Sequence, residues 1–117
     1  MEYTESILDS IKKLLGPSSD YTQFDQDIIT HINTALMDLN RIGIGPPEGF
    51  SIKDSSSVWT DFVEDISKIE GVKTYIYLSV RLVFDPPLNA SILASIERQI
   101  SKLEWTLNVA ADSNTEA

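Results

Sequence analysis

The chain has 117 residues and no cysteine, and its 18 acidic and 9 basic residues give a formal net charge of −9 at pH 7. This length is enough for one domain with a hydrophobic core, and the lack of cysteine excludes a disulfide framework and a thiolate metal site. Proteins that bind phosphate gain affinity from clustered Lys and Arg. Since only Lys12 and Lys13 are adjacent here, the charge argues against sequence-specific DNA binding. A net charge of −9 is consistent with a highly soluble protein, with a basic binding partner, or with a surface that repels nucleic acid.

Two amphipathic helices are predicted in the first third of the chain. Residues 5–15 follow Thr4, which is expected to be the N-cap, and Gly16 and Pro17 end this helix. Residues 25–42 form the second helix after a linker. Its apolar side is made of Ile28, Ile32, Ala35, Leu36, Leu39 and Ile42. The acidic segment at the N-terminus lacks a basic stretch followed by an apolar run, so no signal peptide is predicted and the cytoplasm is the expected compartment.

A long loop is predicted over residues 43–57. Three glycines and two prolines within residues 43–49 cannot continue a helix. Loops of this length in small domains are uncommon and are often functional. A short helical piece is expected after Ser57, with aromatic side chains that hold the loop against the rest of the protein.

The helix predicted over residues 72–84 is apolar around most of its circumference. Its first stripe comprises Val72, Tyr75, Ile76, Ser79, Leu82 and Val83, and a second comprises Tyr77, Val80 and Phe84. Such a helix is normally buried on several sides, which makes it the expected centre of the fold. It is too short to span a bilayer, and Pro86 and Pro87 end it.

The last predicted helix covers residues 90–109, with Asn89 as its N-cap. Its apolar stripe comprises Ile92, Ile96, Ile100, Leu103 and Leu107, whereas Trp105 lies off this stripe. Residues 110–117 carry no large apolar side chain and are predicted to be a mobile tail. The sequence therefore predicts an all-α fold: a small four-helix bundle over residues 1–109, with a long loop between the second and third main helices.

The sequence offers little sign of catalysis. Asp27 and His31 are four residues apart on one predicted helix face, but a catalytic metal usually needs a third protein ligand, and none is indicated. The glycines of residues 43–49 lack the spacing and the lysine of a phosphate-binding loop. We predict no enzyme and no cofactor, and keep a metal enzyme using Asp27 and His31 as a minor alternative.

The sequence carries more apolar and aromatic side chains than one small core requires. Capping of the bundle ends is an equally good interpretation for each of them alone. Taken together, they favour an assembly protein. The candidates for contact with another subunit or protein are Tyr3, Phe50, Trp59, Trp105, Leu107 and Val109.

Three segments resemble the small head-to-tail connector proteins of long-tailed bacteriophages and their prophages. They are residues 72–87 (VKTYIYLSVRLVFDPP), 96–105 (IERQISKLEW) and 27–36 (DIITHINTAL). The resemblance lies in whole-segment pattern, extends over residues 7–108 and leaves out the C-terminal tail.

This resemblance implies a structural virion protein that assembles in the host cytoplasm and stays at the head–tail interface. Its copies would form a ring under the portal protein, most simply a dodecamer, and offer a platform to a stopper or tail-completion protein. DNA would pass through the ring without specific binding, and no membrane would be involved. An acidic inhibitor or DNA mimic remains the alternative from another class.

The resemblance also suggests roles for two regions of the chain. Residues after Trp105 would become ordered on the portal. The loop would face the DNA channel or the stopper, through Gly43, Gly45, Pro46, Pro47, Glu48 and Gly49.

Overall fold

The computed structural model describes residues 5–16 and 22–116, apart from the side chains of Ile66 and of residues 110–116. Its helices are α1 (Ile7–Leu15), α2 (Asp25–Arg41), α3 (Trp59–Phe62), α4 (Ile66–Phe84) and α5 (Ala90–Glu116). The described residues form no β-strand, only an isolated bridge between Ser6 and Val58. The prediction of an all-α fold is confirmed.

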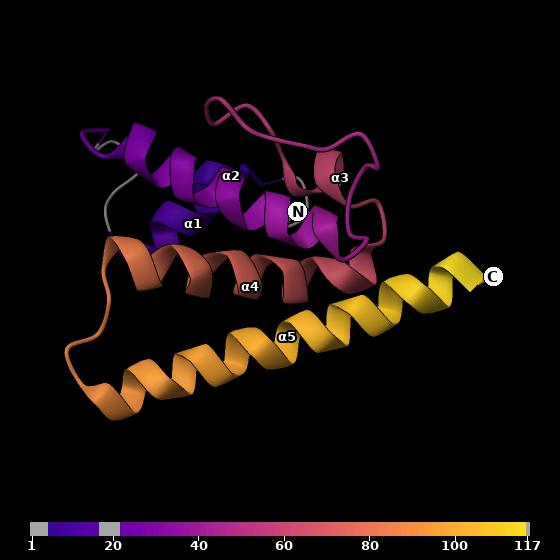
Figure 1. The fold of residues 1–117 in the computed structure, drawn as a ribbon. Helices are drawn as coiled ribbons and strands as arrows, with labels where there is room; N and C mark the ends of the chain where they lie inside the picture. The colour runs from indigo at the N-terminus through magenta and orange to yellow at the C-terminus, as the bar shows by residue number, and fades with distance from the viewer. Residues whose placement is uncertain (1–4, 17–21, 117) are drawn as a thin grey trace.

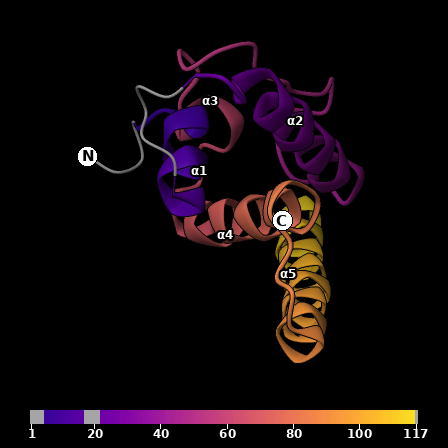
Figure 2. The same ribbon diagram turned by 90° about the vertical axis from the view of Figure 1, so that its left-hand side faces the viewer.

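Helix α4 is the centre of the fold, as its apolar circumference predicts. It contacts each of the other four helices, with α1, α2 and α3 on one side and α5 on the other (Figures 1 and 2). Helix α5 packs chiefly on α4 and extends away from α1, α2 and α3, as Figure 2 shows. The helices thus form a bundle in which α5 reaches the shared core mainly through its contacts with α4.

Helix α4 begins at Ile66, whereas the sequence predicted a start near Val72. The carboxylate of Asp65 caps this earlier start by accepting a hydrogen bond from the Ser67 backbone N–H at 3.0 Å. Gly71 then lies inside the helix, where its low helix propensity costs only about 1 kcal/mol. A start at Val72 places Gly71 before the helix, whereas the helix continues through this glycine.

The ends of α1 and α5 also depart from prediction. Ser6 caps α1, since its Oγ accepts from the Asp9 N–H at 3.2 Å, while the expected cap, Thr4, lies outside the described residues. Asn89 caps α5 as predicted, with its Oδ1 accepting from the Ser91 N–H at 2.8 Å. Helix α5 then continues to Glu116, so the predicted boundary between domain and tail falls inside it.

Helix α1 packs on α2 and α4 of its own subunit. Two buried polar contacts fix it there. The Lys12 ammonium, 1% exposed, lies 2.8 Å from Oδ1 of Asp25, and the Trp59 indole donates a hydrogen bond of 3.0 Å to Oγ of Ser10. Around these contacts the core gathers apolar side chains from every helix, including Ile7, Ile11, Ile28, Ile32, Leu36, Leu39, Trp59, Phe62, Val72, Tyr75, Ile76, Val80 and Leu107.

Two isoleucines of the loop between α2 and α3, Ile44 and Ile52, are buried in the hydrophobic core. The Asn33 side chain donates to the Ile52 carbonyl at 3.0 Å and accepts from the Ile52 N–H at 2.8 Å. The loop is therefore a fixed part of the surface. None of the helices among the described residues is long and apolar enough to cross a bilayer.

Candidate interaction surfaces

The side of α5 that faces away from α4 carries a basic and apolar strip, here called the outer face of α5. It consists of Arg98, Lys102, Trp105 and Val109, which lie in line because their spacings of four, three and four residues follow the helical repeat. Trp105 is 70% exposed and Val109 is 42% exposed. Neither basic side chain has an ion-pair partner among the described residues. The strip contributes nothing to the subunit's own core.

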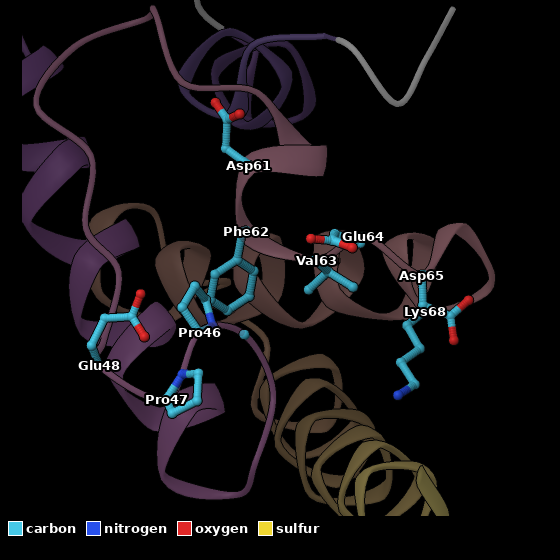
Figure 3. Close-up of a pocket in the computed structure, with 10 residues that line it drawn as sticks. Pro46, Pro47, Glu48, Asp61, Phe62, Val63, Glu64, Asp65 and Lys68 are labelled. Carbon is cyan, nitrogen blue, oxygen red and sulfur yellow. The ribbon is translucent and has the colours of Figure 1, made fainter.

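A second surface is a pocket of about 480 Å³ between the loop, α3 and the start of α4, here called the acidic pocket (Figure 3). Phe62 and Val63 form its apolar floor beside Pro46 and Pro47. Its lining residues are Gly45, Pro46, Pro47, Glu48, Asp61, Phe62, Val63, Glu64, Asp65 and Lys68. Four carboxylates thus stand against one ammonium, on a protein that is acidic overall.

Two of these carboxylates also accept hydrogen bonds from backbone N–H groups. Asp61 accepts a hydrogen bond from the Val58 N–H at 3.0 Å. The hydroxyl and backbone N–H of Ser67 both donate to Asp65 and hold the pKa of that carboxyl below its usual value. Glu48 and Glu64 are exposed and form no ion pair among the described residues. They are free to meet a cationic partner.

A groove of about 320 Å³ separates α2 from α5 above the middle of α4. Its walls carry His31 and Asp38 on one side and Glu104 on the other, and Val83, 60% exposed, lies at its edge. At the floor, the Tyr75 hydroxyl donates to Oε2 of Glu104 at 2.8 Å. Burial, and then this hydrogen bond to Glu104, raise the pKa of Tyr75.

The described residues contain no group of three or more His, Cys, Asp or Glu side chains that could hold a metal ion. Asp27 is exposed on α2, and His31 is half-buried beside the groove. Within the described part of the chain, no third possible metal ligand lies close to Asp27 and His31.

The six interface candidates from the sequence fall into different environments. Trp105 and Val109 are exposed on α5, as an interface requires. Trp59 and Leu107, 1% and 4% exposed, are buried in their own subunit and do not reach a partner in this conformation. Phe50 is half-buried, with its ring centre 5.3 Å from that of Phe62. Tyr3 lies outside the described residues.

The loop candidates lie around the acidic pocket. Gly45, Pro46, Pro47 and Glu48 line it, while Gly43 and Gly49 are exposed at the bends of the loop with φ near +98°. Whether this loop faces a DNA channel or a stopper stays a prediction.

Sequence reasoning missed Arg98, Lys102 and Glu64 as surface candidates. The first two were visible in principle, because they share one side of the predicted helix with Trp105. The pocket around Glu64 could not be predicted from the sequence, because it is formed by residues 45–48 and 61–68, which come together only when the chain folds.

The described residues thus form a small helical protein with two surfaces that its own core leaves uncovered, the outer face of α5 and the acidic pocket. The family model of the phage connector proteins matches residues 7–114, and the chain belongs to this family. It is thus a structural protein of the phage head–tail connection, which implies association with portal and tail proteins and a place in the virion. Comparison with curated proteins and with solved structures gave no match.

Proposed function

We propose that copies of this chain form a closed ring beneath the portal, join the capsid to the tail and extend the channel through which DNA passes. The observation that carries the proposal is the exposed outer face of α5 in a member of the connector family. Trp and Arg are the residues that most often anchor protein–protein interfaces. A ring that continues the portal is most simply a dodecamer.

The net charge of −9 suits a ring around DNA. Carboxylates near the channel repel phosphates, so DNA slides through without being held. In this arrangement the C-terminal turns of α5 bind the portal. The loop at residues 43–57 faces the channel or the stopper and tail-completion proteins.

The test is the mass of the protein in solution, alone and with purified portal protein, by light scattering after gel filtration. We expect a portal-dependent ring with the portal's symmetry. A protein that stays monomeric and never binds the portal would contradict the proposal. A DNA mimic would instead compete with DNA for a DNA-processing enzyme, and such competition without portal binding would favour that alternative.

A further inference from the structure

The outer face of α5 and the acidic pocket are complementary in charge and in apolar character. One surface presents Arg98 and Lys102 beside an exposed indole. The other presents the exposed Glu48 and Glu64 beside Pro46 and the exposed Pro47, above the buried Phe62 and Val63. Opposite charges around an apolar centre are the arrangement that gives protein interfaces their register and specificity.

These two surfaces do not meet within one molecule. Arg98, Lys102 and Trp105 are exposed on the side of α5 opposite the buried Ile96 and Leu107, whereas the pocket is formed by the loop, α3 and the start of α4. Each surface is therefore left without a partner by the fold of its own chain. A second copy is the one partner whose complementary surface the structure itself supplies.

We propose that the outer face of α5 of one copy docks in the acidic pocket of the next. This inference rests on the proposed ring and names the contact that builds it. Arg98 and Lys102 meet Glu48 and Glu64, and Trp105 packs against Pro46 and Pro47, the accessible apolar residues of the pocket. Because the two surfaces are different, the contact is heterologous, and such contacts repeat until the rotation closes a ring.

The geometry also assigns a role to the loop. Pro46 and Pro47 form the side wall of the pocket, so a docked α5 rests against the base of the loop. Docking would then fix the orientation of each loop relative to the ring. Gly49, exposed at a bend of the loop, would stay accessible to the stopper or tail-completion protein.

The first experiment reverses charge on each surface. Arg98→Glu with Lys102→Glu, and separately Glu48→Lys with Glu64→Lys, should each weaken ring assembly about tenfold or more, measured by sedimentation with the portal protein present. All four changes in one chain should restore it. All four residues are exposed, and Asp61 and Asp65 are left alone because they hold backbone N–H groups.

Matched controls change the same charge elsewhere. Lys13→Glu with Lys53→Glu, and Glu70→Lys with Glu97→Lys, involve exposed residues outside both surfaces and should assemble as the wild type does. Circular dichroism confirms that every variant is folded.

The second experiment uses the absence of native cysteine. A mixture of Lys102→Cys and Glu64→Cys chains should oxidise mainly to the mixed disulfide dimer, while Lys53→Cys with Glu64→Cys should not. Cross-linking that shows no preference, or assembly that both charge reversals leave unchanged, would overturn the docking while the ring proposal stands. A wild-type chain that forms no assembly, alone or on the portal, would overturn both.

Discussion

At the scale of single residues, Gly45 shows how closely the loop fits the body. Its φ is +90°, and a Cβ built there would overlap the ring of Phe62, reaching Cζ at 2.8 Å. Phe62 is buried and cannot move aside easily. Gly45→Ala should therefore lower the free energy of unfolding by about 2–4 kcal/mol, from backbone strain and steric overlap together.

Gly49 is the matched control for this substitution. Its φ is +98°, but no heavy atom lies within 4 Å of the Cβ that an alanine would add. Gly49→Ala should cost only the backbone strain, about 1 kcal/mol. Urea unfolding measures both, and equal losses for the two variants would show that Phe62 does not restrict the loop.

Tyr75 predicts how stability depends on alkaline pH. Burial, and the hydrogen bond and charge of Glu104, raise the pKa of Tyr75 in the folded state above its value of about 10 in the unfolded chain. Folding thus favours the neutral phenol. The stabilisation is complete below about pH 10 and is lost as the pH rises towards the folded-state pKa.

The thermal midpoint of the wild type should accordingly begin to fall as the pH rises above about 10 and continue to fall towards the folded-state pKa. Tyr75→Phe should be less stable at neutral pH by about 1 kcal/mol, since its hydrogen bond is lost, but should show a shallower alkaline decline. Tyr77→Phe, on another side of α4, serves as the control and should keep the wild-type slope. An unchanged slope in Tyr75→Phe would contradict the assignment.

At the scale of elements, the last turns of α5 lie beyond the contacts that hold this helix on the body. Ile96 and Leu107 bury its inner side against the body, while the turns after Val109 extend past these contacts. Deleting residues 109–117 should abolish portal binding and leave most of the helical circular dichroism. Pull-down with the portal protein tests this, and undiminished binding would show that the C-terminal turns are not the portal contact.

The elements that sequence predicted well are those fixed by local signals. The apolar stripe of α2, the Asn89 cap and the stop before Pro86 each depend on neighbours within a few residues. The true start of α4 and the full length of α5 were missed. In both cases a weak local signal, Gly71 or the small polar residues after Val109, was given more weight than continuation of the helix.

At the scale of the whole molecule, the predictions that fell short depended on contacts between distant residues. Trp59 looked like a surface candidate, yet its indole bonds to Ser10 across 49 positions of the chain and lies in the core. The acidic pocket likewise exists only once the loop has folded against α3 and α4. By contrast, the central position of α4 and the exposure of Trp105 followed from helical periodicity alone.

The side chains of the outer face of α5 take no part in the core of their own subunit. Substitutions there can accordingly accumulate without endangering the monomer. In the proposed ring, a change on this strip must be matched by a change in the acidic pocket of the same chain, while the buried helices stay as they were.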